Sequence, residues 1–238
     1  MLTISELCKQ YTGPSGTLPV LSGVNFTVEE GDFLVILGKS GCGKTTLLRI
    51  IGGFLPADSG SVLLDQRPVD EPSDQMIMIF QSFDQLFPWF TLEENIAYAL
   101  KKTKKIKDAH ARMETARHYL EITGLLEFGD HYPHTLSGGM KQRGALARAM
   151  ALKPRLLLMD EPFSSLDYLT RKAAQASLIN LVSSNGSTVI LVTHDIEEAL
   201  RLGTKIAILD KDSHRLSFWY DHPKDRPHLK EELEEALR

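Results

Sequence analysis

The run from Gly38 to Thr45 has the residue types of a phosphate-binding loop. It reads Gly-Lys-Ser-Gly-Cys-Gly-Lys-Thr and stands between an apolar run, 33–37, and a stretch expected to be helical, 44–51. Glycines let successive backbone N–H groups wrap a phosphate, and the following helix points its positive end at the same oxygens. Lys44 would add a charge for the β- and γ-phosphates, and Thr45 a hydroxyl for Mg²⁺. A Gly-rich turn before a helix is the alternative interpretation. The candidate nucleotide contacts here are Gly38, Ser40, Gly41, Cys42, Gly43, Lys44, Thr45 and Thr46.

Two carboxylates, Asp160 and Glu161, follow the apolar run 156–159. Ligands of open α/β sheets gather at the carboxyl ends of strands, where these side chains are expected to lie. Asp160 could hold Mg²⁺ through its water shell, and Glu161 could orient the attacking water and accept its proton. An exposed acidic strand end is the alternative, but a phosphate loop in the same chain favours phosphoryl transfer, which needs mainly positioning and charge neutralisation.

Two more polar residues follow expected strands. Gln81 comes after 76–80, and His194 comes after 189–192. Gln81 could touch Mg²⁺ or the attacking water, and His194 could donate a hydrogen bond to the γ-phosphate. A lone Gln or His is more often ordinary surface, so only their place at strand ends of a nucleotide-binding sheet makes them candidates for catalysis.

The run Ser137-Gly138-Gly139 opens a second expected helix, 141–151. A hydroxyl, small residues and free N–H groups at a helix start form another anion-binding arrangement. One nucleotide does not easily need two such cradles in one subunit. The run therefore predicts a grip on the γ-phosphate of a nucleotide held by a second copy of the chain, the alternative being a simple helix cap.

The elements around these residues predict an α/β fold of the P-loop NTPase class with a mostly parallel sheet. Residues 2–30 alternate short β-like runs with turns, which indicates an N-terminal antiparallel β subdomain. Residues 82–153 are expected to form an inserted helical subdomain, and 1–81 with 154–238 the core that includes the β subdomain.

The composition is that of a soluble globular protein. The 238 residues include 27 Lys plus Arg against 31 Asp plus Glu, so no basic excess suggests a nucleic-acid partner. The apolar runs are far shorter than the roughly 20 residues that span a bilayer. Cys8 and Cys42 make no disulfide framework and are expected to be reduced thiols.

The ordered set of motifs resembles an ATP-binding cassette subunit over residues 2–209. The phosphate loop is similar to the Walker A motif of that family, 136–140 to its signature, 156–161 to its Walker B motif, and His194 to its switch histidine. The resemblance implies ATP and Mg²⁺ as cofactors, ATP hydrolysis, a homodimer with two ATP at its interface, and Tyr11 as the aromatic residue that stacks on adenine.

Several stretches, such as 64–69 and 86–89, resemble the ATPase subunits of nitrate, sulfonate and taurine importers more closely. That group implies a peripheral protein on the cytoplasmic face of the inner membrane, energising uptake of a small solute through a separate permease. An extracytoplasmic binding protein would deliver the solute, and 81–90 would form part of the surface that receives the permease. A soluble cassette ATPase without a permease, or the ATPase of an exporter or lipid-transfer system, are the alternatives.

The resemblance fades after Asp210, and 222–227 are only loosely similar to the basic, proline-containing tail of the importer group. The solute contacts belong to the permease and the binding protein. The sequence therefore leaves the substrate open among nitrate, sulfonates, taurine, bicarbonate and small heterocycles.

Overall fold

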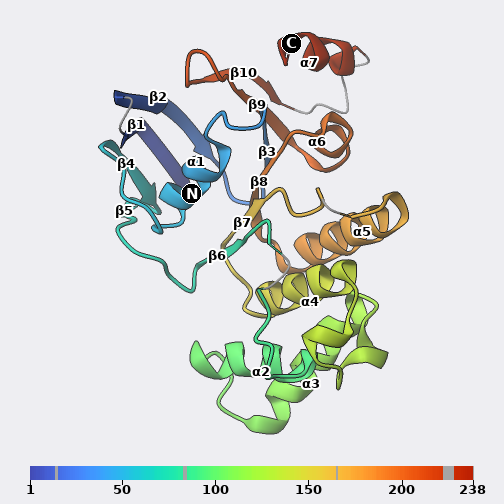
Figure 1. The fold of residues 1–238 in the computed structure, drawn as a ribbon. Coiled ribbons are helices and arrows are strands. Elements are labelled where there is room, and N and C mark those ends of the chain that lie inside the picture. Colours follow the sequence, from blue (N-terminus) through green and yellow to red (C-terminus); the bar gives the residue numbers. More distant parts are fainter. Residues whose placement is uncertain (14–15, 83–84, 165, 222–227, 238) are drawn as a thin grey trace. The chain divides into compact units, whose positions relative to one another are not determined.

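The computed structural model describes residues 1–13, 16–82, 85–164, 166–221 and 228–237. It divides into two compact units (Figure 1), the first made of 1–73, 158–161 and 188–238 and the second of 74–157 and 162–187. The expected division placed 74–81, 154–157 and 162–187 with the core, whereas in the structure they belong to the second unit. The strand β6 (Met76–Ile79) and the helix α5 (Tyr168–Asn185) in these segments both pack on α4 (Gly138–Ala151).

An antiparallel sheet of four strands begins the first unit, in the order β2-β1-β4-β5. Its strands are β1 (Leu2–Gly13), β2 (Gly16–Val28), β4 (Ser59–Leu64) and β5 (Arg67–Pro68). Leu2, Ile4 and Leu7 of β1 are buried, and β1 pairs with both β2 and β4. The expected N-terminal antiparallel subdomain is confirmed.

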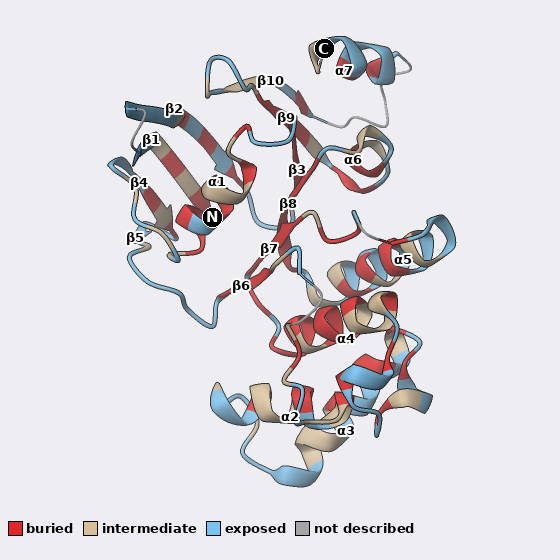
Figure 2. Cartoon of the chain, in the orientation of Figure 1, coloured by how far each residue is buried: buried red, intermediate tan, exposed pale blue. Residues whose placement is uncertain are grey.

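In the second sheet, the strands that belong to this unit follow the order β10-β9-β3-β8-β7, and β7 contributes only its last residues to the unit. Its strands are β3 (Phe33–Leu37), β7 (Leu156–Asp160), β8 (Thr188–Thr193), β9 (Lys205–Leu209) and β10 (Leu216–Asp221). β3 pairs in parallel with β8 and β9, whereas β10 runs antiparallel to β9. The residues of β3, β7 and β8 are all buried, as continuous apolar runs in a parallel sheet require (Figure 2).

Three helices complete the first unit: α1 (Lys44–Ile51), α6 (Ile196–Leu202) and α7 (Leu229–Ala236). α1 follows β3 through the glycine-rich loop, which is the strand, loop and helix order that the sequence predicts. α6 begins at its N-cap Asp195, whose side chain accepts a hydrogen bond from the backbone N–H of Glu198.

The second unit is mainly helical and is drawn from green to orange in Figure 1. Its elements are β6 (Met76–Ile79), α2 (Leu92–Lys102), α3 (Ala109–Ile122), η1 (Leu126–Phe128), η2 (Pro133–Thr135), α4 (Gly138–Ala151), the first residues of β7, and α5 (Tyr168–Asn185). Side chains cap the helix starts: Thr91 and Glu94 form a capping box on α2, and Asp167 accepts two backbone N–H bonds on α5. α5 ends at Gly186 in the left-handed conformation.

Gly144 of α4 shows why this unit needs a glycine inside a helix. A Cβ at this position would lie 2.8 Å from Cδ2 of Leu92 on α2 and 3.4 Å from Cδ1 of Leu86. The missing side chain lets α4 approach the buried start of α2. Close packing thus offsets the roughly 0.5 to 1 kcal/mol of helix stability that glycine costs relative to alanine.

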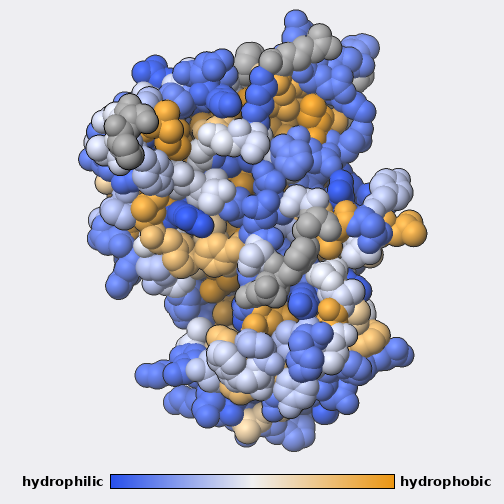
Figure 3. Space-filling model, in the orientation of Figure 1, coloured by the Kyte–Doolittle hydropathy of each residue, from blue (hydrophilic) through white to orange (hydrophobic). Residues whose placement is uncertain are grey.

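Hydrophilic residues cover most of the face of the molecule in Figure 3, and hydrophobic residues gather in smaller separate areas. Within the described ranges, no helix is long and apolar enough to cross a membrane. The largest exposed apolar side chains include Trp89, at 66%, and Leu169, at 75%.

Candidate nucleotide-binding and hydrolysis site

The phosphate loop joins the buried end of β3 to the first residue of α1. Gly41 and Gly43 have φ angles of +78° and +106°, a region that side chains disfavour, and Gly43 stands at the N-cap of α1 without a side-chain cap. Gly38 is needed for a different reason, because a Cβ there would lie 2.9 Å from the carbonyl oxygen of Leu209. The loop therefore has the tight curvature, with free N–H groups at a helix start, that cradles phosphate.

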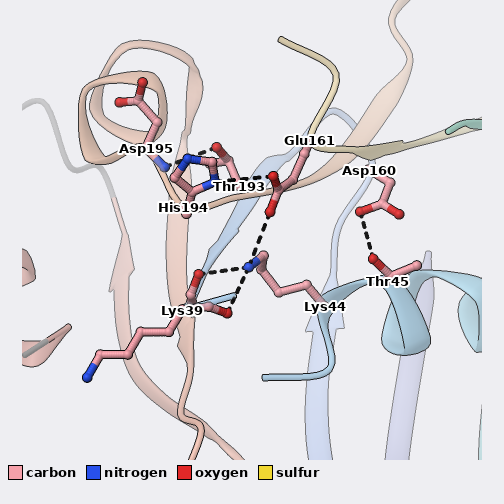
Figure 4. A network of polar contacts seen from close by, with 9 residues as sticks. Lys39, Lys44, Thr45, Asp160, Glu161, Thr193, His194 and Asp195 are labelled. Carbon is pink, nitrogen blue, oxygen red and sulfur yellow. Dashed lines mark hydrogen bonds and ion pairs between the residues drawn. The ribbon is translucent and has the colours of Figure 1, made fainter. Parts of the chain in front are cut away.

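Lys44 is held inside this loop. Its side chain is 5% exposed, and its Nζ donates to the carbonyl oxygens of Gly38 at 2.8 Å and Lys39 at 3.0 Å. Nζ also lies 3.4 Å from Oε1 of Glu161. The ammonium group is thus fixed close to the loop's backbone, where it can neutralise phosphate oxygens (Figure 4).

Glu161 links the lysine to the histidine predicted from the next strand. Its Oε2 lies 3.2 Å from Nδ1 of His194, and its backbone N–H donates to the carbonyl oxygen of Val192 on β8. Glu161 has a φ of +43°, a conformation uncommon for residues other than glycine and frequent at functional sites. Figure 4 shows its carboxylate between Lys44 and His194, so a candidate base touches both a phosphate-binding cation and a candidate γ-phosphate ligand.

Thr45 and Asp160 form the predicted metal-binding pair. Thr45 Oγ1 donates to Asp160 Oδ1 at 3.1 Å, and Asp160 is only 4% exposed. Burial raises the pKa of Asp160, an effect that the bond from Thr45 partly opposes. A carboxylate and a hydroxyl suit Mg²⁺, which prefers oxygen ligands and usually takes one or two carboxylates together with substrate phosphates. A cation beside Asp160 would compensate for the burial of its charge, so these residues fit the ion.

The described residues contain no group of three or more His, Cys, Asp and Glu side chains that could hold a metal. Mg²⁺ held at Thr45 and Asp160 would take its remaining ligands from nucleotide phosphates and water. Such an ion would neutralise charge on the β- and γ-phosphates.

Tyr11, on β1, lies beside the helix that follows the phosphate loop. Its side chain is 45% exposed, and its Oη is 3.5 Å from Oγ1 of Thr46 in the first turn of α1. Lys9 lies over the ring, with Nζ 5.9 Å from the centroid. The exposed aromatic ring is therefore next to a predicted nucleotide contact, where it can stack on a base.

The second unit holds the Ser137 run. Ser137 is exposed and caps α4, accepting a hydrogen bond from the N–H of Met140 at 3.3 Å. Gly139 packs against α5 so closely that a Cβ there would lie 2.2 Å from Cγ2 of Thr170. The run therefore combines an exposed helix start with a glycine that packing requires.

Gln81 also belongs to the second unit. It is exposed, and β6 ends at Ile79, so Phe80 stands between the strand and Gln81. The strand expected from the sequence extends to Phe80. A role for Gln81 at the metal or the attacking water stays a prediction.

The structure explains two buried residues, Cys42 in the phosphate loop and Asn95 in the helical unit. Cys42 is 1% exposed, and burial raises the pKa of its thiol, which keeps it in the unreactive protonated form. Asn95 on α2, which is not among the predicted site residues, is fully buried. Its side chain bonds the backbone of Phe87, Phe90 and Thr91. Asn95 stands among the apolar residues Leu92, Ile96 and Leu100 at helical spacing, and that polar interruption was the available signal.

Comparison with known proteins identifies the family of this chain. The family model described as ABC transporter matches residues 21–164, more than half of the chain. The chain belongs to the ABC transporter family. Membership confirms that it is an ATP-hydrolysing cassette of the P-loop NTPase fold, with ATP and Mg²⁺ as cofactors.

Relatives in this family match most of the chain. It is 37% identical over 231 residues to the nitrate import ATP-binding protein NrtD of Synechococcus elongatus, covering 97% of this chain and 84% of the relative. It is 43% identical over 209 residues to the aliphatic sulfonates import ATP-binding protein SsuB of Bacillus cereus, covering 87% and 80%. A solved structure of the ATP-binding cassette MJ0796, dimeric and bound to ADP and Pi, superposes with a TM-score of 0.81 at 32% identity, covering 93% of this chain and 98% of the other.

Proposed function

We propose that this chain is the ATP-hydrolysing subunit of an importer, energising uptake of a small solute through a separate membrane permease. The observation that carries the proposal is the contact of Glu161 with both Lys44 and His194. It joins the phosphate loop to the ends of two further strands, as a hydrolysis site requires. The import direction is supported by the relatives, which are named import ATP-binding proteins for nitrate, bicarbonate and sulfonates.

In the proposed mechanism Glu161 orients the attacking water and accepts its proton. Lys44 and the loop N–H groups neutralise the β- and γ-phosphates, and His194 donates a hydrogen bond to the γ-phosphate. Thr45 and Asp160 hold Mg²⁺, with Gln81 as a further ligand of the ion or the water. Phosphoryl transfer needs chiefly such positioning and charge neutralisation.

The active form is proposed to be a head-to-tail homodimer with two ATP molecules at its interface. Ser137, Gly138 and Gly139 of one copy would then hold the γ-phosphate of ATP bound to the other. The exposed cap of α4 supports this role, as do the dimeric solved structures of a related cassette. Replacement of Ser137 by Arg should block the shared site. Full ATPase activity in that variant would count against the shared-site dimer.

The permease is proposed to dock on the segment 81–90 of the second unit. Phe87 contacts Trp89, Phe90 and Tyr98, with ring centroids 5.3 to 6.0 Å apart, and Trp89 is mostly exposed. Exposed aromatic clusters on a rigid frame are common at protein interfaces. Residues 83–84 of this segment lie outside the described residues. The proposed location of the chain is the cytoplasmic face of the inner membrane. An extracytoplasmic solute-binding protein would act on the chain only indirectly, through the permease.

The direct test is to purify the tagged chain from its native membranes in mild detergent and identify its partners. A stoichiometric integral-membrane permease is the expected result. The chain with Trp89 replaced by Ser serves as the test variant, and it should recover less permease than the parent chain at equal expression. A chain that is recovered only with non-membrane partners would instead favour a soluble cassette ATPase.

A further inference from the structure

A hollow of about 410 Å³ lies in the first unit, away from the phosphate loop, and its walls come from both sheets. It is bounded by 25–27 of β2 on one side and by Lys205 of β9 on the other, together with four residues of β10: Leu216, Ser217, Trp219 and Asp221. In the described sheets β2 and β10 are both edge strands (Figure 1). Neither strand contributes a residue to the hydrolysis site described above, so this hollow is a separate feature.

Two aromatic rings form the apolar part of its wall. Phe26 and Trp219 have ring centroids 6.3 Å apart with planes inclined at 40°. Phe26 is buried, but Trp219 is 37% exposed. The indole N–H of Trp219 donates to Oδ1 of Asp221 at 3.2 Å. Since its only polar atom is already bonded, Trp219 contributes aromatic surface to the hollow.

The lining of the hollow carries one lysine, Lys205, and one carboxylate, Asp221. Lys205 is paired with Asp32 at 2.8 Å, and the hydrogen bond that it donates to Asp32 raises the pKa of Lys205, with Glu29 and Asp221 adding to the effect. Three carboxylates thus act on one ammonium group. The lysine is already neutralised by its partner, which makes the wall unsuited to an anion.

The remaining polar side chains of the wall are largely engaged elsewhere. Asn25 donates to Oε1 of Glu6 and to the carbonyl oxygen of Gly23, and its own oxygen accepts the N–H of Glu6. Asp221, by contrast, accepts the indole N–H through one oxygen and keeps further acceptor capacity. Aromatic ring faces attract alkylated ammonium groups, and a carboxylate beside such a ring can add the opposite charge.

We propose that this hollow binds a small organic cation of the alkylated ammonium class. The cation would lie against the ring of Trp219, with Asp221 supplying the opposite charge and Phe26 the apolar contact. The hollow would bind a cation, whereas the phosphate loop places positively charged groups around an anion. The site is therefore a second ligand site of the ATPase and does not depend on the proposed importer function.

The chain provides its own probe, because it contains two tryptophans, Trp89 and Trp219. In the full-length Trp89→Phe variant, Trp219 is the remaining tryptophan. Titration with tetramethylammonium chloride, against sodium chloride at equal ionic strength, should change its fluorescence saturably with a Kd of roughly 1 mM. The additional change Asp221→Asn should weaken binding by about tenfold or more, since it removes the charge but keeps the shape.

Two controls make the result decisive. The Trp219→Phe variant, which keeps Trp89, should show no saturable change, and sodium acetate should produce none in the Trp89→Phe variant. Thermal unfolding of every variant should stay a single cooperative transition above the assay temperature, which excludes loss of the fold as the cause of weaker binding. The proposal is overturned if tetramethylammonium gives no saturable change, if Asp221→Asn leaves the Kd unaltered, or if acetate binds as well.

Discussion

Replacing Glu161 by Gln should stop hydrolysis while ATP binding persists. The amide has nearly the shape of the carboxylate and keeps an oxygen near His194, but it is a far weaker proton acceptor. General base catalysis contributes about 10²- to 10⁴-fold to rate, which corresponds to about 2.7 to 5.4 kcal/mol at ~1.36 kcal/mol per tenfold. We therefore expect the turnover number to fall by at least a hundredfold.

The same change should leave ATP affinity equal or higher. Glu161 Oε1 lies 3.4 Å from Nζ of Lys44, and the side chains are 16% and 5% exposed. At that separation the Coulomb attraction is about 5 kcal/mol for an effective dielectric constant of ~20, before the cost of desolvation is subtracted. A triphosphate must compete with this carboxylate for the ammonium. Since desolvation cancels most of the attraction, we expect a gain in affinity of about tenfold at most.

Phosphate release measures the rate, and calorimetric titration with Mg²⁺ and ATP measures binding to the slow variant. Size-exclusion chromatography with and without ATP reports dimer formation, which should persist. Glu197→Gln on α6 is the matched control, because that carboxylate is 71% exposed and pairs with Lys230; its rate should stay within about twofold of the parent. Hydrolysis by Glu161→Gln at the parent rate would refute the assigned base.

Three further predictions concern stability. Burial raises the pKa of Asp160, so the folded, nucleotide-free protein disfavours its charge and loses stability as pH rises through the raised pKa. Asp160→Asn should therefore unfold at a higher temperature at pH 7, and the difference should vanish below the ordinary carboxyl pKa of 3.8. An unchanged difference at every pH would contradict this. Gly144→Ile should lower the free energy of unfolding by about 1 to 3 kcal/mol in urea, because its Cβ would overlap Leu92, whereas Ala173→Ile at an exposed site on α5 should change it far less. Asn95→Leu should cost about 2 to 4 kcal/mol, because it leaves partly buried backbone groups of the 87–91 turn without partners. An unchanged urea midpoint would show that water satisfies them.

Local patterns in the sequence predicted the parts of the fold that depend on near neighbours. The strand Phe33–Leu37 and the helix Lys44–Ile51 appear with the expected bounds, because a short apolar run, glycines and a helix start lie within one continuous segment. Ser137 as a helix cap is similarly local. The unit to which α5 belongs was not predictable in this way, because it depends on the packing of α5 against α4.

The sequence by itself determined which residues could do the chemistry, because the residue types and their order already specify a phosphate loop, a carboxylate pair and a histidine after strands. Only the tertiary structure decided which of them meet. Thr45 and Asp160 are 115 residues apart, and Glu161 and His194 are 33 apart, yet each pair lies within 3.2 Å. The reason is the parallel sheet, which brings the carboxyl ends of β3, β7 and β8 to one edge. The aromatic hollow beside β10 likewise exists only because two sheet edges, distant in sequence, face each other in the folded first unit.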